Sequence, residues 1–462
     1  TKKMTAVFEG DGVPAIAMLK GAPAVVLASC THFLDSDGAE RPLDEDSRKR
    51  FLSINEEMAG RALRVLAFAD KRSLGDEELE LENDFTFLGL AGMTDPPRAE
   101  VPEAIVKARS AGIRIVMITG DQLITAQAIA RQLRLSEGRD VVAFHSKDLD
   151  GGADLAALAR SAHVFARVSP EDKLRIVEAL QQDGEIVAVT GDGINDAPAL
   201  KRSDIGVAMG KRGTDVAKEA ADIVLTDDNF STIIKAVEGG RTIYSNIIKF
   251  VHMMFSHNLA EVLVIFCAIV AGLPLPLLPL QILWINLVTD IFPALALAVE
   301  PATPETMMRR PRSPKESLLS ARFMFLIGWQ GVMLAAIALG AYAWSLRSYG
   351  AGAHAHTVAL LAVVAVQAGH LFYCRSRSRS AFYRFFTNPF IFAAVGIVVL
   401  LQVLAMTFTP LMKVLGTVTP TWADWISALL CLLLPIAIVE ITKLISRSGG
   451  SGNSFAASTE SE

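Results

Sequence analysis

Apolar and polar residues follow different patterns in the two halves of this chain. Before residue 250, short apolar runs alternate with charged stretches of helical periodicity. After residue 250, six apolar windows approach the roughly 20 residues that a membrane-spanning helix needs. They lie near residues 247–272, 276–298, 323–346, 356–374, 389–409 and 423–445. The pattern therefore predicts a soluble half followed by an all-α bundle of six transmembrane helices.

The charges of the connecting segments predict the orientation of the membrane half. Short cytoplasmic loops are enriched in Lys and Arg. Such residues precede the first window and follow the second, fourth and sixth, whereas the other three connectors hold one Lys and no Arg. They are Lys235, Arg241, Lys249, Arg309, Arg310, Arg312, Lys315, Arg375, Arg377, Arg379, Arg384, Lys443 and Arg447. We expect a multi-pass protein of the cell membrane, with its soluble half and C-terminus in the cytoplasm.

The soluble half has the alternation of an α/β protein. Short β-rich runs are separated by helical stretches at 98–112, 122–134 and 170–182. The runs cover 85–92, 113–119, 163–168, 185–191 and 204–209. This order predicts a parallel sheet with helices on both faces, in which ligands bind beyond the C-terminal ends of the strands.

Three segments place polar residues at predicted strand ends, where each opens a helix. They are "MITGD", "ARVSPEDK" and "VTGDGIND", with Thr119, Gly120, Asp121, Arg167, Lys173, Thr190, Gly191, Asp192, Gly193, Asn195 and Asp196. Helix N-termini and a Thr hydroxyl can bind phosphate, Lys can neutralise developing charge, and a carboxylate can hold Mg²⁺. We interpret Asp192 as the metal ligand and Lys173 as the neutralising group. A simple turn and a solvated Lys would explain any one segment, but three together favour phosphoryl transfer.

Polar oxygens also occur inside the first two apolar windows. Asn286, Thr289 and Asp290 share a helix face, and we expect Asn258 and Glu261 to do likewise in the preceding window. Together they would form a site for a hard cation, which offsets the cost of burying carboxylates in lipid. Polar contacts between helices are the alternative, but they explain the two acids poorly. Prolines at 274, 276, 279 and 293 could help to unwind the second helix and free carbonyl ligands.

Composition narrows the function further. Hydrophobic residues make up 51% of the 462 residues, too many for a soluble protein. A net charge of -5, from 44 Lys and Arg against 49 Asp and Glu, argues against a nucleic-acid-binding protein but allows a local nucleotide site. We interpret the four cysteines, Cys30, Cys267, Cys374 and Cys431, as reduced packing residues because they have no paired spacing.

Several longer motifs resemble one family. "TGDGINDAPALKRSDIGVAMG" resembles the hinge signature of P-type cation-transporting ATPases, as do "KGAP" at Lys20, "DPPR" at Asp95 to Arg98, and "MITGD". "DDNFSTIIKAVEGGRTIYSNI" resembles the stretch that leads into the fifth membrane helix of these pumps. The resemblance covers the chain except its tail and is strongest to type II, which contains calcium pumps and sodium/potassium pumps.

The resemblance implies a domain order and a set of site residues. Residues 1–84 would be part of the α+β nucleotide-binding domain, 85–232 the haloacid-dehalogenase-like phosphorylation domain, 233–447 the stalk and six-helix membrane domain, and 448–462 a disordered tail. ATP would lie near Lys20, Gly21, Arg64, Thr119, Gly120, Asp121, Arg167, Lys173 and Asn195. Catalysis would involve Thr119, Gly120, Asp121, Lys173, Asn195 and Asp196, with Mg²⁺ held by Asp192.

The family's phosphorylated aspartate lies in a DKTGT motif, which this sequence does not contain. Also absent are the TGES segment of the actuator domain and the first four membrane helices. We therefore expect the sequence to be the C-terminal part of a pump, inactive alone because no aspartyl phosphate can form, and completed by the N-terminal part of the same pump.

The resemblance favours calcium as the transported ion, because Asn286 matches calcium pumps. Gln367 stands where many calcium pumps carry Glu, and fewer carboxylates suggest one ion per cycle. Alternatives are a pump for Na⁺ and K⁺, Mn²⁺ or H⁺. We hypothesise that His257 carries a proton or acts as a counter-charge, against the alternative of a packing side chain.

Two rival functions share part of this pattern. A membrane-tethered haloacid-dehalogenase-like phosphatase would not need Glu261 and Asp290. A non-catalytic membrane module would not need Lys173, Asp192 and Asn195. Residues 230–272 are predicted to form one long helix, which in a pump could transmit motion from the phosphate site to Glu261.

Overall fold

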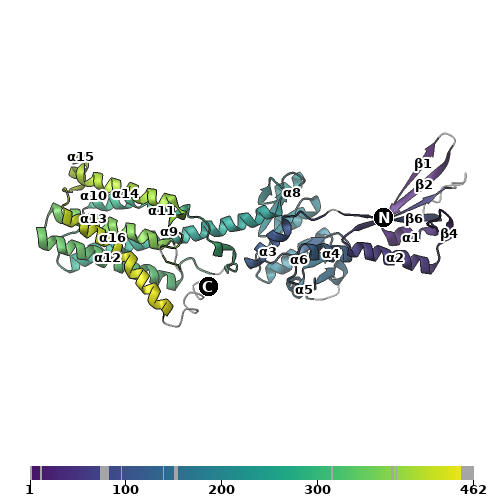
Figure 1. Cartoon of the computed structure of the whole chain (residues 1–462), viewed down its shortest axis with the longest axis horizontal. Coiled ribbons are helices and arrows are strands. Elements are labelled where there is room, and N and C mark those ends of the chain that lie inside the picture. Colours follow the sequence, from purple (N-terminus) through teal and green to yellow (C-terminus); the bar gives the residue numbers. More distant parts are fainter. Residues whose placement is uncertain are drawn as a thin grey trace. The chain divides into compact units, whose positions relative to one another are not determined.

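The computed structural model describes residues 3–10, 13–72, 83–94, 96–138, 140–149, 154–313, 316–375, 379–380 and 382–448 (Figure 1). It divides into two compact units, Thr1–Ile234 and Lys235–Glu462. Asp95, Lys315, Arg377 and residues 449–462 of the expected tail lie outside the described residues.

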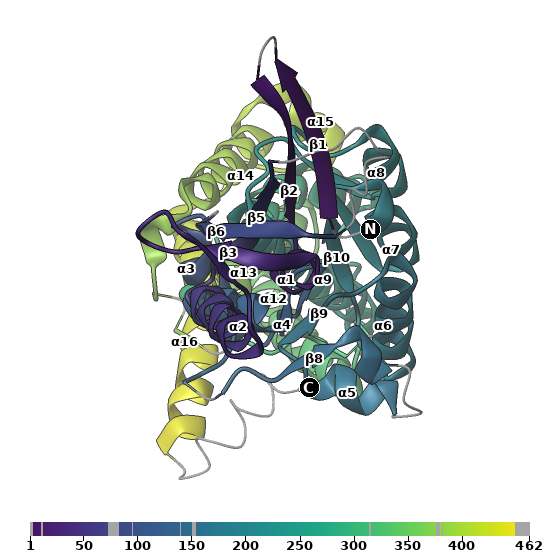
Figure 2. The same ribbon diagram turned by 90° about the vertical axis from the view of Figure 1, so that its right-hand side faces the viewer.

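The first unit begins with a six-stranded sheet of order β1-β2-β5-β6-β3-β4 (Figure 2). Its strands are β1 (Lys3–Gly10), β2 (Val13–Gly21), β3 (Cys30–Leu34), β4 (Glu40–Pro42), β5 (Arg64–Lys71) and β6 (Phe85–Met93). All neighbours are antiparallel except β3 and β6. Alternate residues such as Leu19, Ala67 and Phe85 form its core with apolar residues of α1 (Pro23–Ala28) and α2 (Glu45–Gly60). The period-2 pattern thus buries one face of the sheet.

The strand expected at residues 85–92 is present, but its assignment to the parallel sheet is wrong. As β6 it pairs with β5 and β3 of the first sheet. The first sheet therefore continues past residue 84, where we expected the nucleotide-binding part to end. The apolar pattern reports that a strand is buried but not which strands it pairs with.

The rest of the first unit consists of short parallel strands and helices. Two three-stranded sheets have the orders β10-β11-β12 and β7-β9-β8, where we expected one continuous sheet. The strands are β7 (Met117–Thr119), β8 (Ala143–His145), β9 (Val164–Ala166), β10 (Ala188–Gly191), β11 (Ile205–Met209) and β12 (Ile223–Leu225). The helices are α3 (Val101–Ser110), α4 (Leu123–Gln132), η1 (Ser146–Leu149), α5 (Leu155–Ser161), α6 (Pro170–Gln182), η2 (Ile194–Asp196), α7 (Ala197–Arg202) and α8 (Asp215–Ala220).

Local sequence explains where the important helix α6 begins. The Ser169 hydroxyl accepts from the Asp172 N–H at 3.2 Å, and the Ser169 N–H donates to Asp172 Oδ2 at 3.2 Å. Pro170 occupies the first turn, where its missing N–H costs nothing. This cap fixes the start of the helix that carries Lys173.

Among the described residues, six helices are long and apolar enough to span a membrane, as expected, and apart from the first turn of the first they lie in the second unit. The candidate spans are Phe230–Val270, Pro279–Ala298, Ala321–Tyr349, Ala353–Cys374, Pro389–Thr407 and Trp422–Ile445. They correspond to α9 (Phe230–Val270), α10 (Pro279–Trp284) with η3 (Ile285–Thr289) and α11 (Ile291–Ala298), α12 (Ala321–Tyr349), α13 (Ala353–Cys374), α14 (Pro389–Thr407) and α16 (Trp422–Ser448). The connectors include η4 (Pro304–Met307), η5 (Phe385–Thr387) and α15 (Thr409–Leu415). Helix α13 is the most buried of the six spans and packs against α12 and α16.

We expect Gly369→Ala to destabilise the bundle. A Cβ at Gly369, on α13, would clash with the Leu432 carbonyl oxygen of α16. Relieving that clash requires a backbone shift, at a cost of about 1–3 kcal/mol or more. Gly340→Ala is the matched control, because a Cβ there has no neighbour within 4 Å. Thermal unfolding of the detergent-purified chain should show a lower midpoint for Gly369→Ala only; equal midpoints would contradict this packing.

Candidate functional site

The loop after β7 is held by its own polar groups. Thr119 Oγ1 accepts from the Asp121 N–H at 3.1 Å and donates to Asp121 Oδ2 at 3.0 Å. Thr119 pairs with Ala166 at the ends of β7 and β9, and the Arg167 N–H donates to the Asp121 carbonyl at 3.2 Å. Arg167 itself has a left-handed φ of 59°. Two strand ends thus bring Thr119, Asp121 and Arg167 together.

A second polar group joins α6 to the loop after β10. Lys173 Nζ forms an ion pair with Asp196 Oδ1 at 2.5 Å. Asp196 Oδ2 accepts from the N–H groups of Asp192 and Gly193 at 3.2 and 3.1 Å. Burial alone would raise the pKa of Asp196, but the hydrogen bond from Lys173 and those from the two backbone N–H groups hold it below its ordinary value. Asp196 therefore orders the loop that presents Asp192.

Because the pKa of Asp196 is lowered in the folded state, its stabilising contribution is present above the pKa of the unfolded state, about 3.9. That contribution is lost as pH falls through the lower folded pKa. We expect Asp196→Asn to reduce the hydrogen-exchange protection of residues 188–202 at pH 6, with the deficit shrinking below about pH 4. Asp215→Asn is the control, since the Asp215 side chain is 97% exposed. A deficit that stays constant with pH would contradict this role.

A cleft of about 270 Å³ lies between the first sheet and the β7–β9 loops. Five predicted nucleotide-binding residues line it: Gly21, Arg64, Gly120, Asp121 and Arg167. Its lining also includes Asn55, Gln122 and Thr125, which sequence reasoning missed. Gln122 and Thr125 directly follow the "MITGD" motif, so extending that motif by one helical turn would have found them.

The remaining predicted residues of the soluble half lie outside this lining. Lys20 is exposed on β2, and Asp192 and Asn195 are exposed in the loop after β10. The Asp192 backbone is fixed because its carbonyl accepts from the Thr214 N–H at 2.9 Å. An exposed carboxylate on a fixed backbone suits a Mg²⁺ ligand.

The second membrane span is interrupted where its polar residues lie. A π-helical turn, Ile285–Thr289, separates α10 from α11, and the Asp290 N–H donates to the Ile285 carbonyl at 3.1 Å. Pro293 has no N–H for the Thr289 carbonyl and its ring crowds that oxygen, which favours the wider turn. The helix is therefore widened here and not unwound. The turn presents Asn286, Thr289 and Asp290 to the bundle.

Glu261 on α9 connects this turn to α13. Its Oε2 accepts from Asn286 Nδ2 at 3.1 Å, and its Oε1 accepts from Gln367 Nε2 at 2.8 Å. Glu261 and Gln367 are each 4% exposed. Three helical segments thus meet at one buried carboxylate.

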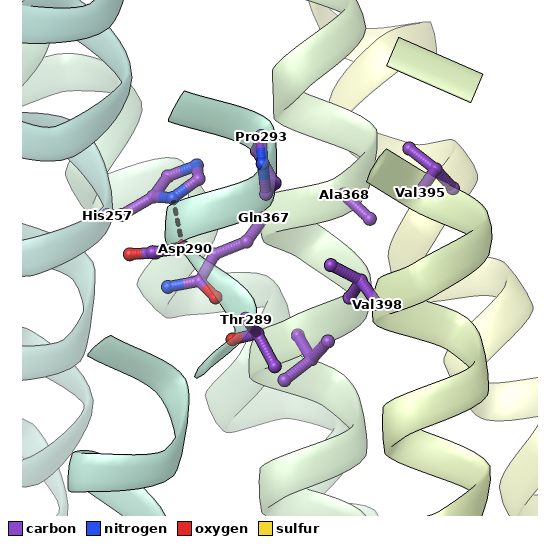
Figure 3. A pocket seen from close by; sticks show the side chains of 9 residues that line it. His257, Thr289, Asp290, Pro293, Gln367, Ala368, Val395 and Val398 are labelled. Atoms are coloured by element: carbon purple, nitrogen blue, oxygen red, sulfur yellow. Dashed lines mark hydrogen bonds and ion pairs between the residues drawn. The ribbon is translucent and has the colours of Figure 1, made fainter. Parts of the chain in front are cut away.

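Asp290 lies next to this group in a small cavity of about 10 Å³ (Figure 3). His257, Thr289, Asp290 and Gln367 line the cavity, and His257 Nδ1 lies 3.2 Å from Asp290 Oδ1. Within the described part of the chain, the buried Asp290 Oδ2 and Gln367 Oε1 have no hydrogen-bond partner. Buried oxygens without a partner are costly unless a donor or cation meets them. Both atoms fit a hard cation.

Not every predicted ligand joins the cluster. Asn258 is exposed, although it lies only three residues before Glu261. By contrast, the buried His257 lies four residues before Glu261 and contacts Asp290. Its role as a proton carrier or counter-charge stays a prediction. We name Glu261, Asn286, Thr289, Asp290 and Gln367 the oxygen cluster.

Comparison with known proteins supports one family across the chain. The protein-family model described as the C-terminus of cation-transporting ATPases matches residues 274–445. The model of the P-type ATPase cytoplasmic domain N matches residues 1–100, and that of haloacid dehalogenase-like hydrolases matches 174–237. Along the chain, the three matches fall on the six-stranded sheet, on the segment with the β10-β11-β12 sheet, and on the helical bundle.

Curated relatives match nearly the whole chain. "Calcium-transporting ATPase 1" of Bacillus cereus is 43% identical over 94% of this chain and 51% of the relative. "Calcium-transporting ATPase" of Bacillus subtilis is 40% identical over 92% of this chain and 48% of the relative. "Probable cation-transporting ATPase F" of Mycobacterium bovis is 42% identical over 91% and 47%. The chain spans about half the length of the curated relatives it matches.

The soluble unit carries the strand-end loops of a haloacid dehalogenase-like domain, and the membrane unit carries buried carboxylates among six apolar helices. With the family matches and relatives at about 40% identity over more than nine-tenths of its length, the chain belongs to the P-type cation-transporting ATPases.

Proposed function

We propose that the protein containing this chain is an ATP-driven cation pump and that its transported ion is Ca²⁺. The oxygen cluster carries the proposal, because it holds two buried carboxylates, and two partnerless oxygens belong to Asp290 and Gln367, which line one small cavity. Lipid offers no solvent for such groups, so a bound cation is the simplest partner. Relatives named as calcium-transporting ATPases support the same choice.

Ca²⁺ suits the oxygen cluster because every proposed ligand would coordinate the ion through an oxygen atom. Ca²⁺ accepts carboxylate, amide and hydroxyl oxygens in flexible geometry. With two carboxylates, one Ca²⁺ would be electrically balanced, which favours a single ion per cycle. Na⁺, K⁺, Mn²⁺ and H⁺ are the alternatives that an experiment must separate.

The soluble unit would supply the phosphoryl chemistry. ATP would lie in the cleft lined by Arg64, Gly120, Asp121 and Arg167. Mg²⁺ on Asp192 would neutralise phosphate charge, while Lys173 orders the loop through Asp196 and adds positive charge. The phosphorylated aspartate would come from the remaining part of the protein, so this chain alone should form no phosphoenzyme.

The basic connectors support an orientation with the soluble unit in the cytoplasm of a cell-membrane protein. Helix α9 contains Glu261 and extends from Phe230 to Val270 without interruption. We propose that this helix transmits conformational change from the phosphorylation chemistry to the oxygen cluster.

The test is phosphorylation of the full-length protein by ATP in Ca²⁺, Mn²⁺, Na⁺ or K⁺. We expect an acid-stable acyl phosphate, cleaved by hydroxylamine, only with Ca²⁺. Phosphorylation supported best by another cation would reassign the ion. ATP hydrolysis that is independent of all four cations would favour an H⁺ pump or the tethered phosphatase and would overturn Ca²⁺ as the transported ion.

A further inference from the structure

Three nitrogen and sulfur donors gather in the membrane unit outside the oxygen cluster. They are His252 on α9 and His370 and Cys374 on α13. One donor atom of each lies within 4.8 Å of those of the other two. Their exposures are 0%, 0% and 1%, so all three are sealed from solvent.

Gln330 on α12 orients both imidazole rings. Its Oε1 lies 2.5 Å from His252 Nε2 and 2.8 Å from His370 Nε2. A carbonyl oxygen only accepts, so both Nε2 atoms carry the hydrogen and the neutral rings keep their lone pairs on Nδ1. Such outer hydrogen bonds fix the rings of metal-binding histidines.

The spacing along α13 fits a shared ion. His370 and Cys374 are one turn apart, and Cys374 Sγ lies 3.5 Å from His370 Nδ1. A tetrahedral ion with bonds of about 2.3 Å to sulfur and 2.0–2.1 Å to nitrogen separates these ligands by roughly 3.5 Å. His257 Nε2 also lies 3.2 Å from His370 Nδ1. A metal ion bound to His370 Nδ1 would therefore take the place of the hydrogen bond from the His257 N–H.

Aromatic packing explains part of the arrangement. His252 lies 5.8 Å from the Phe323 ring and 6.0 Å from the Tyr373 ring, centroid to centroid. This packing accounts for ring placement, but it does not require two imidazoles and a thiol to converge.

We propose that His252, His370 and Cys374 bind one d¹⁰ transition-metal ion, Zn²⁺ or Cu⁺. Binding releases the Cys374 thiol proton to solvent and forms a metal–thiolate bond, with two neutral imidazoles completing three ligands. The complex keeps one positive charge with Zn²⁺ and none with Cu⁺. Ca²⁺ is excluded as the ion because it prefers oxygen ligands. This site shares no ligand with the oxygen cluster, although His257 contacts both His370 and Asp290, and it does not depend on the proposed pump function.

The test measures metal binding to the 462-residue chain in lipid nanodiscs. Zn²⁺ and Cu⁺ are titrated separately against chromophoric chelators, and Co²⁺ serves as the spectroscopic probe of thiolate coordination. We expect one ion per chain and a thiolate-to-Co²⁺ charge-transfer band. Cys374→Ser should remove the band, and Gln330→Leu should weaken binding roughly 10–100-fold while keeping all three donors.

The controls use the other thiols. Cys267 is exposed, so every variant carries Cys267→Ser. Cys431→Ser removes a buried thiol on α16 and should leave binding unchanged. Failure of both Zn²⁺ and Cu⁺ to bind would overturn the proposal, as would a band that survives Cys374→Ser. If Cys374→Ser elutes as aggregate, two other results test the proposal in its place: loss of the charge-transfer band in Cys374→Ala and weaker metal binding by Gln330→Leu.

Discussion

Asp290→Asn is expected to weaken Ca²⁺ activation of the proposed full-length pump by roughly 100- to 4,000-fold. The substitution removes one of the two buried carboxylates of the oxygen cluster and leaves His257 facing a neutral amide. Removing one partner of a buried charge pair costs about 3–5 kcal/mol, which corresponds to this change in affinity. The measurement is the Ca²⁺ concentration that gives half-maximal phosphorylation by ATP.

Glu261→Gln and Asn258→Ala complete this experiment. Glu261 contacts Asn286 and Gln367. Glu261→Gln should therefore raise the half-maximal Ca²⁺ concentration as much as Asp290→Asn. Asn258 is exposed on the same helix, and its replacement should change the half-maximal Ca²⁺ concentration little. Equal effects of all three substitutions would show that the oxygen cluster does not bind the ion.

Lys173→Met should slow phosphorylation of the proposed full-length pump by about 10²–10³-fold, the usual effect of losing one electrostatic contact to a transition state. It also leaves the Asp196 carboxylate without its ion pair and so loosens the loop that presents Asp192. Single-turnover phosphorylation with saturating Ca²⁺ and ATP measures this rate.

Arg175→Met is the matched control for Lys173→Met. Arg175 lies on the same helix, α6, but pairs with Asp172 and is 44% exposed. Such exposed pairs contribute only about 0–1 kcal/mol. If Arg175→Met slowed phosphorylation as much as Lys173→Met, a general defect of α6 would explain both results.

The sequence predicted the elements whose signal is local. Six windows of sufficient length became six helices, and the polar residues after β7 and β9 meet because strand ends of a parallel pair coincide. The sequence did not predict to which sheet β6 belongs, because the pattern of buried residues does not encode which strands pair. Neither was the division into two parallel sheets.

The faces of α9 show the limit of spacing arguments in the candidate site. Each residue turns the helix by about 100°, so residues three apart differ by about 60° and residues four apart by about 40°. Glu261 therefore shares the buried face with His257 more closely than with Asn258. The contact of His252 and His370 through Gln330 joins three helices, and no single stretch of sequence records it.

The most direct test locates the cation itself. A structure of the full-length protein with Ca²⁺ should contain one ion bound by carboxylate oxygens of both Glu261 and Asp290, at about 2.3–2.6 Å. Asp290 Oδ2 and Gln367 Oε1 should then have a partner. An ion bound elsewhere in the membrane helices, or Glu261 and Asp290 on faces too distant to share one ion, would contradict the account.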